Sequence, residues 1–142
     1  MSDLISRYKI LKEYNLIIEC HSGNLDLDSY INFVIMTTHD PLFFQNMNYL
    51  IDLRNVVITA PIDDVEKYNY FTETKFKSER KRKVAILTES PNQMAFSTIF
   101  KMLNTQKLKK IEVFSTTDMA IRWLNNSNKK EILDVLGVLM NP

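Results

Sequence analysis

Glycine is scarce in this chain, because Gly23 and Gly137 are the only two among its 142 residues. A dinucleotide-binding fingerprint needs several glycines in one strand-to-helix turn, and a P-loop needs two before its lysine, since the backbone must approach phosphate closely. Two glycines so far apart in the sequence cannot form either motif. The G-x-S-x-G nucleophile elbow and the His-Glu-x-x-His zinc motif are also absent. We therefore predict a protein that is not an enzyme.

Cysteine and histidine are equally few. Cys20 is the single cysteine, so no disulfide can form within the chain, and His21 and His39 are the two histidines. Zinc sites need a cluster of such ligands at characteristic short spacings. We therefore expect no structural metal and no cofactor.

Long apolar runs are missing as well. No run approaches the ~20 residues that a membrane-spanning helix needs, and the first residues lack the cationic segment, apolar core and cleavage site of an export signal. With 45% hydrophobic and 25% charged residues, the composition is typical of a soluble globular domain. We expect a cytoplasmic protein without a membrane span, folded as one domain.

Short runs of aliphatic and aromatic residues predict five strands. They cover 8–13, 15–22, 49–53, 84–88 and 111–114. Tyr14-Asn15 leaves room for a tight reversal between the first two runs, which we therefore expect to form a hairpin. Val56–Ile58 follows the third run after a turn at Arg54-Asn55, and either extends that strand or forms a separate short edge.

The clearest helical pattern follows the strand at 84–88, where Ser90 and Gln93 are spaced as a capping box around Pro91. Apolar residues then recur at helical spacing: Phe96, Ile99, Phe100 and Leu103. Four further helices are predicted after Asn24 or Asp26, from Pro61 to about Phe76, after a capping pair of Ser115 and Asp118, and at 127–140. We predict a single α/β domain over residues 1–142, with a mixed, mainly parallel sheet of about five strands and packed helices.

Three segments carry a family pattern: Leu50–Leu53 before a short apolar run, Lys83–Leu87 leading to a helix, and Glu112–Phe114 followed by Ala120–Leu124. These segments resemble the bacterial SpoIIAA-like branch of the STAS domains. The resemblance covers about Tyr8–Asn125. It implies a mixed sheet with helices packed on it, related in shape to anti-sigma-factor antagonists and to a lipid-binding fold.

The family antagonists carry an Asp-Ser phosphoacceptor at the start of the helix after the third strand. Aligned on Asp52 and Val56, the family pattern places Ala60 and Pro61 where this pair would stand. The acceptor hydroxyl is missing. Thr59 lies one residue earlier and could replace it only if the loop were shifted, so the phosphorylation switch that the resemblance implies lacks its acceptor here.

Four polar residues are predicted near the carboxyl ends of strands, where open α/β sheets bind ligands: Asp52, Arg54, Asp63 and Glu89. An enzyme would need them to converge on one cavity, but no nucleophile is spaced to act with them. Roles in caps and turns are the other interpretation. Tyr68 and Phe71, on the second predicted helix, could line an apolar pocket or belong to the core.

Charge is distributed unevenly along the chain. Residues 1–74 carry five Lys or Arg and eleven Asp or Glu, whereas residues 75–110 carry ten and two. The basic part, which includes Lys81, Arg82 and Lys83, could attract phosphate groups, lipid head groups or an acidic partner, or form a solvated helix end. We predict no specific nucleic-acid partner.

We predict a non-enzymatic STAS-like regulatory or protein-interaction module that binds a protein partner or a second copy of itself as a homodimer. The alternative is binding or sensing of a hydrophobic or lipid-like small molecule in a pocket beneath the second helix. The candidate partner or ligand surface comprises Asp52, Arg54, Thr59, Asp63, Tyr68, Phe71 and Glu89.

Overall fold

Five strands form one sheet in the order β1-β2-β3-β4-β5 in the computed structural model, which describes residues 3–75, 80–125 and 128–142. The strands are β1 (Ile5–Leu11), β2 (Leu16–Leu25), β3 (Asn48–Ile58), β4 (Arg82–Leu87) and β5 (Lys109–Phe114). β1 pairs antiparallel with β2 through the predicted hairpin, and the other neighbours are parallel. The predicted mixed, mainly parallel sheet is confirmed.

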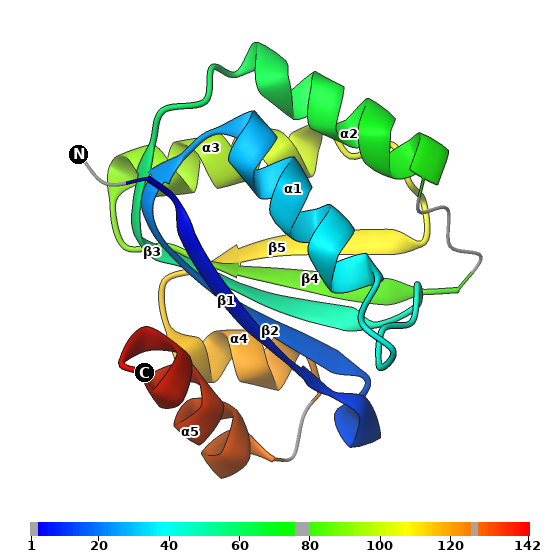
Figure 1. The fold of residues 1–142 in the computed structure, drawn as a ribbon, viewed down its shortest axis with the longest axis vertical. Coiled ribbons are helices and arrows are strands. Elements are labelled where there is room, and N and C mark those ends of the chain that lie inside the picture. Colours follow the sequence, from blue (N-terminus) through cyan, green and yellow to red (C-terminus); the bar gives the residue numbers. More distant parts are fainter. Residues whose placement is uncertain (1–2, 76–79, 126–127) are drawn as a thin grey trace.

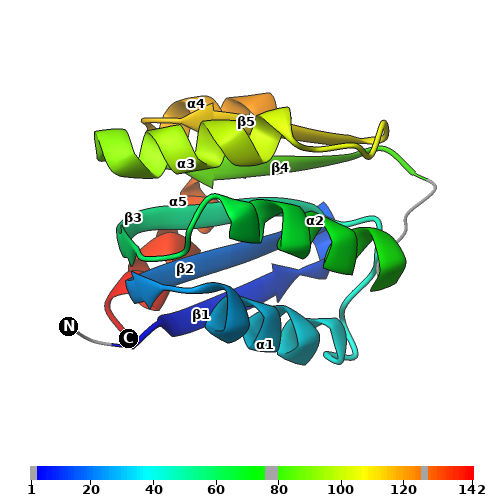
Figure 2. The same ribbon diagram turned by 90° about the horizontal axis from the view of Figure 1, so that it is seen from above.

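Helices cover both faces of this sheet (Figure 1). The linking helices α1 (Leu27–Thr38), α2 (Asp63–Lys75) and α3 (Pro91–Met102) lie on one face, whereas α4 (Thr117–Trp123) and α5 (Lys129–Met140) lie on the other (Figure 2). Right-handed crossovers in a sheet whose strand order follows the sequence place all linking helices on one side. Phe76 and residue 127, two predicted helix ends, lie outside the described residues. Every described helix is too short or too polar to span a bilayer.

Alternate residues of the strands supply a separate apolar core to each face, as the period of two requires. The core beneath α4 and α5 includes Leu16, Ile18, Leu50, Ile121, Leu124, Ile132 and Leu136. The core beneath the three linking helices includes Leu25, Ile51, Leu53, Val84, Ile86 and Ile111. Neighbouring residues of β3 therefore serve opposite faces of the sheet.

β3 runs without a break through Arg54 and Asn55, so the predicted turn there is wrong. Its parallel pairing with β2 shifts register between Cys20 and Ser22, where β3 holds one residue more than β2. A β-bulge absorbs such an extra residue and lets the strand continue. The polar residues that suggested a turn mark this irregularity instead.

Two helix starts test the predicted caps. Ser90 caps α3 as predicted, because its hydroxyl accepts the amide three residues later at 3.2 Å and the capping box is complete. The pair Ser115 and Asp118 predicted for α4 is wrong. Thr116 is the N-cap, and its hydroxyl accepts the Met119 amide at 3.3 Å. Ser115 and Thr116 both carry a hydroxyl that could cap the helix. The cap is Thr116, one residue later than the sequence predicted.

Gln93 joins the start of α3 to the part of β3 that extends past β4. Its Nε2 donates to the carbonyl oxygens of Arg54 at 3.1 Å and Val56 at 3.0 Å. Its Oε1 accepts the amides of Glu89 at 2.8 Å and Ser90 at 3.1 Å. One buried side chain thus satisfies four backbone groups and fixes α3 against the sheet.

Candidate ligand-binding site

An apolar cavity of about 80 Å³ lies beneath α2, lined by residues of the three linking helices and the sheet. Its floor consists of aliphatic side chains from three neighbouring strands: Leu25, Ile51, Leu53 and Ile86. These residues point to this face because they alternate with the residues that fill the opposite core. The alternation of side chains along each strand therefore determines which residues form the cavity floor.

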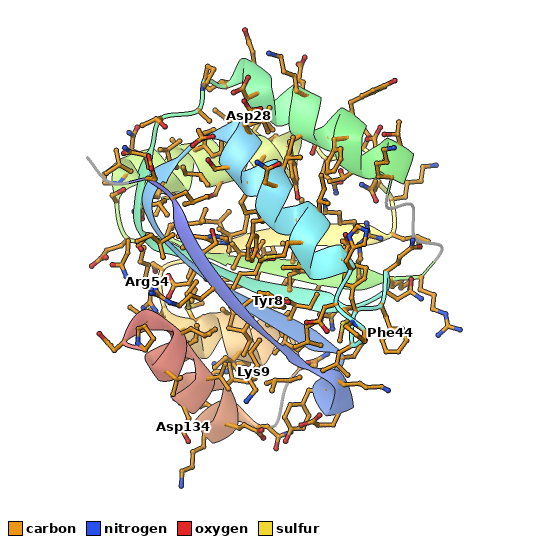
Figure 3. All side chains as sticks on the ribbon, in the orientation of Figure 1. Tyr8, Lys9, Asp28, Phe44, Arg54 and Asp134 are labelled. Atoms are coloured by element: carbon orange, nitrogen blue, oxygen red, sulfur yellow. The ribbon has the colours of Figure 1, made fainter. Side chains whose placement is uncertain are left out.

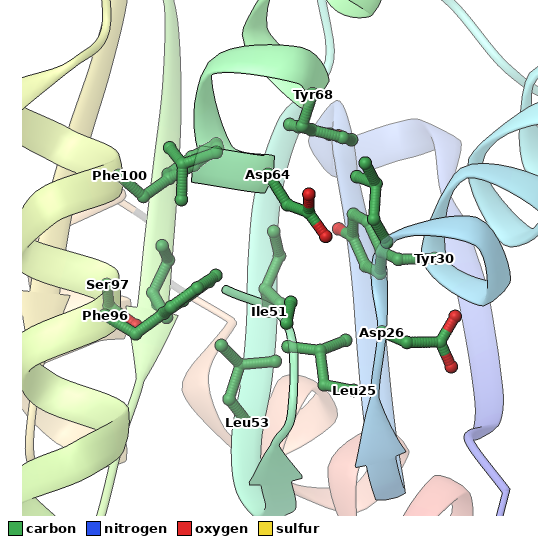
Figure 4. Close-up of a pocket in the computed structure, with 14 residues that line it drawn as sticks. Leu25, Asp26, Tyr30, Ile51, Leu53, Asp64, Tyr68, Phe96, Ser97 and Phe100 are labelled. Carbon is green, nitrogen blue, oxygen red and sulfur yellow. The ribbon is translucent and has the colours of Figure 1, made fainter. Parts of the chain in front are cut away.

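Aromatic side chains form the walls of this cavity (Figure 4). Phe96 and Phe100 project from α3, Tyr30 projects from α1, and Tyr68 projects from α2. The ring centroids of Tyr30 and Tyr68 are 5.4 Å apart, and those of Tyr68 and Phe100 are 5.7 Å apart. Contacts at these separations hold aromatic rings in fixed relative positions, so the three helices share one aromatic cluster around the cavity.

Few polar groups reach the cavity. Ser97 is 1% exposed, and its hydroxyl has no hydrogen-bond partner within the described residues. Asp26 points away from the cavity (Figure 4) and accepts the Ser29 amide at 2.8 Å, and hydrogen bonds from Ser29 lower the pKa of this carboxyl group. Asp64 forms an ion pair with Lys67 at 3.4 Å. The cavity thus presents an apolar surface with one free hydroxyl.

A second cavity of about 70 Å³ adjoins the first. The two cavities have four lining residues in common: Tyr30, Ile51, Tyr68 and Phe100. Unlike the first, the second cavity has many polar lining residues: Glu19, Thr37, Thr38, Gln45, Tyr49, Thr72, Arg82 and Lys109. The apolar first cavity and the second cavity, with its polar lining residues, therefore lie side by side behind α2.

The carboxylate in the second cavity belongs to a buried network. Glu19 accepts from His21 Nε2 at 2.9 Å and from the Tyr30 hydroxyl at 3.1 Å. His21 Nδ1 lies 2.7 Å from Ser6 Oγ. Burial, together with the charge of Glu19, raises the pKa of the Tyr30 hydroxyl well above its usual value. Glu19 therefore already has two hydrogen-bond donors.

Two buried cations lie in the same cavity. Arg82 is 6% exposed and its Nη2 donates to Gln106 Oε1 at 2.6 Å, whereas Lys109 is 8% exposed and its Nζ lies 5.3 Å from the centroid of the Phe100 ring. Burial lowers the pKa of Arg82, and it lowers the pKa of Lys109 to about 8. Two buried cationic side chains therefore line the second cavity together with Glu19.

Three of the predicted site residues lie elsewhere. Arg54 binds Asp52 through Nε to Oδ1 at 3.0 Å and Nη2 to Oδ2 at 2.8 Å, close to α5 (Figure 3). The hydrogen bond to Asp52 raises the pKa of Arg54, and the charge of Glu89 adds to this effect. Neither cavity is lined by Asp52, Arg54 or Glu89. Asp52 and Arg54 form a partly buried ion pair, and Glu89 is a nearby exposed carboxylate.

The other predicted site residues have different positions. Thr59 donates its hydroxyl to the Leu25 carbonyl oxygen at 3.1 Å, and Asp63 is exposed in the first turn of α2. Tyr68 lines both cavities, whereas Phe71 lines neither, although the two ring centroids are 6.4 Å apart. The polar candidates Asp52, Arg54, Asp63 and Glu89 do not converge on either cavity. Among the described residues, no group of three or more His, Cys, Asp or Glu could hold a metal ion.

Sequence reasoning missed Tyr30, Arg82 and Lys109 as site residues. Tyr30 lies in the helix predicted after Asp26, and helical spacing does not distinguish a core residue from one that lines a cavity. Arg82 belongs to the basic segment, and the alternation of β4 buries it while Lys83 donates to the Trp123 carbonyl oxygen on the other face. The alternation of β4 was the sequence signal that could have identified Arg82 as a buried residue.

Comparisons with known proteins identify the fold. Neither the protein-family models nor the curated proteins include a match to this chain. Among solved structures, the chain is similar to an uncharacterized protein from the DUF3478 family with a SpoIIAA-like fold, from Shewanella loihica PV-4. The two share 15% sequence identity with a TM-score of 0.57, over 87% of this chain and 98% of the other. The chain therefore has a SpoIIAA-like fold, as its sequence resemblance predicted.

Proposed function

We propose that this chain, with its SpoIIAA-like fold, is a non-enzymatic STAS-like module that binds a hydrophobic or lipid-like small molecule beneath α2. The observation that carries the proposal is the apolar cavity of about 80 Å³, with aromatic walls from three helices. Of the two predicted pocket residues on α2, Tyr68 forms part of these walls and Phe71 does not. We place the protein in the cytoplasm.

Filling an apolar cavity with an apolar group is energetically favourable. Side chains around a cavity lose dispersion contacts on one side, at a cost of ~24 cal/mol per Å³ of cavity in protein cores. For a volume of about 80 Å³ this corresponds to roughly 2 kcal/mol that a ligand could recover. An engineered apolar cavity of ~150 Å³ binds benzene. The two adjoining cavities, of about 80 and 70 Å³, together approach that size.

Thermal unfolding with and without 1-octanol tests this proposal. Ala60 lines the cavity, so Ala60→Leu places additional atoms in it, whereas Ala95→Leu makes the same change at an exposed position of α3. We expect octanol to raise the melting temperature of the wild type and of Ala95→Leu but not of Ala60→Leu. An unchanged melting temperature in the wild type at saturating octanol would contradict the proposal.

A second candidate function is binding of a protein partner or a second copy. It is supported by two exposed apolar residues at the helix that covers the cavity: Tyr70 on α2 is 72% exposed, and Ile62, in the turn before α2, is 54% exposed. We expect light scattering to show a dimer for the wild type and a monomer for Tyr70→Ser. A monomeric wild type at all concentrations would exclude the homodimer.

A further inference from the structure

We infer that the second cavity binds the anionic head group of an amphiphile, with Arg82 and Lys109 as the cationic contacts and the first cavity holding its apolar body. This inference rests on the proposed function, because the apolar body would occupy the cavity beneath α2. It adds the chemical class of the ligand: a carboxylate on a thin aliphatic chain, as in a medium-chain fatty acid.

Arg82 provides a buried donor that has no acceptor. Its Nη1 is buried and lacks a hydrogen-bond partner within the described residues, although Nη2 is held by Gln106. A buried donor without a partner is unfavourable, and more so when the group is charged, so native structures rarely leave one unpaired. Arginine binds carboxylates with matching geometry. A carboxylate in the cavity would therefore satisfy this nitrogen.

Lys109 places a second cation beside the first. Arg82 and Lys109 are register partners in the parallel ladder of β4 and β5, and both line the second cavity. Like charges in such positions repel each other. The charge of Arg82 accordingly adds to the burial that lowers the pKa of Lys109. An anion between the two side chains would attract both cations and so offset this repulsion.

The described carboxylates do not pair directly with these cations. Glu19 lines the cavity but already accepts hydrogen bonds from two buried donors. The charge of Glu73 raises the pKa of Lys109, but this effect is smaller than those of burial and Arg82, which lower it. No ion pair within 4.0 Å joins Arg82 or Lys109 to a carboxylate in the described part of the chain. The lining therefore carries two cations and one carboxylate.

The strands arrange the two chambers along one line. On β4, Arg82 and Val84 line the second cavity and Ile86 lines the first. These residues share one face, and four residues of strand span ~13 Å. On β3, Tyr49 lines the second cavity and Ile51 lines both. The sheet surface thus changes from cationic to apolar along the strand direction, as an extended amphiphile requires.

Calorimetric titration of the full chain with sodium octanoate, 1-octanol and inorganic phosphate tests this assignment. The variants are Arg82→Gln and Lys109→Met, and Lys110→Met is the control because Lys110 is exposed on the same strand. A charged hydrogen bond of 1.5–3 kcal/mol predicts that octanoate binds the wild type and the control at least about tenfold more tightly than octanol. We expect this advantage to disappear in both variants. Lys109→Met keeps the test decisive if Arg82→Gln does not fold.

Each contrary result identifies which part fails. Equal affinities for octanoate and octanol in the wild type would overturn the anion site and leave the proposed function intact. Failure of both to bind would overturn the proposed function as well. An octanoate advantage that persists in both variants would overturn the roles of Arg82 and Lys109. Displacement of octanoate by equimolar phosphate would overturn the amphiphile, because phosphate has no apolar body.

Discussion

Arg54 holds Asp52 in a bidentate ion pair on the face of the sheet that α4 and α5 cover, with the two hydrogen bonds at 3.0 and 2.8 Å. Asp52 is 2% exposed, so this carboxylate depends on its partner for compensation. Breaking a fully buried pair from one side typically costs about 3–5 kcal/mol, and the Arg54 side chain is 25% exposed. We expect Arg54→Met to lower the free energy of unfolding by up to this amount, as measured by urea denaturation.

The double variant Asp52→Asn/Arg54→Met provides the control, because it removes both charges while the amide oxygen still accepts the backbone N–H of residue 54. We expect it to recover part of the lost stability. Arg122→Met, at an exposed position, should change stability little. A loss in Arg54→Met no larger than in Arg122→Met would show that the ion pair contributes nothing measurable.

Lys109 is expected to destabilise the free protein near neutral pH. Its pKa falls from 10.5 to about 8 in the folded state, so folding buries a charge below pH 8 and a neutral amine above 10.5. At ~1.4 kcal/mol per pH unit, Lys109→Met should stabilise the protein by roughly 3 kcal/mol at pH 7. The gain should shrink as the pH rises from 8 to 10.5, because the wild type becomes more stable. A gain independent of pH would contradict burial of the charge.

Gln93 is expected to be among the most sensitive polar positions. Gln93→Ala would leave two carbonyl oxygens of β3 and two amides at the start of α3 without their partner. Each buried unpaired group costs about 1–3 kcal/mol, so we expect a loss of several kcal/mol by chemical denaturation. Gln45→Ala is the comparison, because Gln45 is exposed. Similar stabilities for the two variants would contradict the bridging role.

Three hydroxyl deletions test the helix starts. Removal of an N-cap typically costs ~1 kcal/mol, so Ser90→Ala and Thr116→Ala should each lower the free energy of unfolding by about this amount. Ser115→Ala should have little effect, because Ser115 is exposed and is not the cap of α4. Thermal denaturation would measure all three. A larger loss for Ser115→Ala than for Thr116→Ala would restore the cap that the sequence predicted.

Local patterns predicted the fold well because most elements follow their own residues. The i, i+3, i+4, i+7 spacing after the capping box defines α3, and the apolar run at 84–88 defines β4. The bulge beside Arg54 could not be predicted, since the pairing that absorbs the extra residue comes from β2. The side chain of Gln93, distant in sequence, also supports this part of β3.

The site was harder to predict than the fold. Tyr68 was identified from its aromatic neighbours on α2, but the cavity also needs side chains from α1, α3 and the sheet. Arg82 and Lys109 come together only through the pairing of β4 with β5. Their sequence positions show two surface-like cations 27 residues apart. Whether a charged strand residue is buried depends on the face of the sheet to which its side chain points. That face is determined only when the sheet is assembled.

The most direct test of small-molecule binding beneath α2 is NMR of methyl-labelled protein with sodium octanoate. We predict nuclear Overhauser effects from the ligand methylenes to the methyl groups of Ile51, Leu53 and Ile86 on the cavity floor. We predict none to Leu124 and Leu136, which belong to the core beneath α4 and α5. Contacts to this second set, or no contacts to the first set at saturating octanoate, would contradict the proposed site.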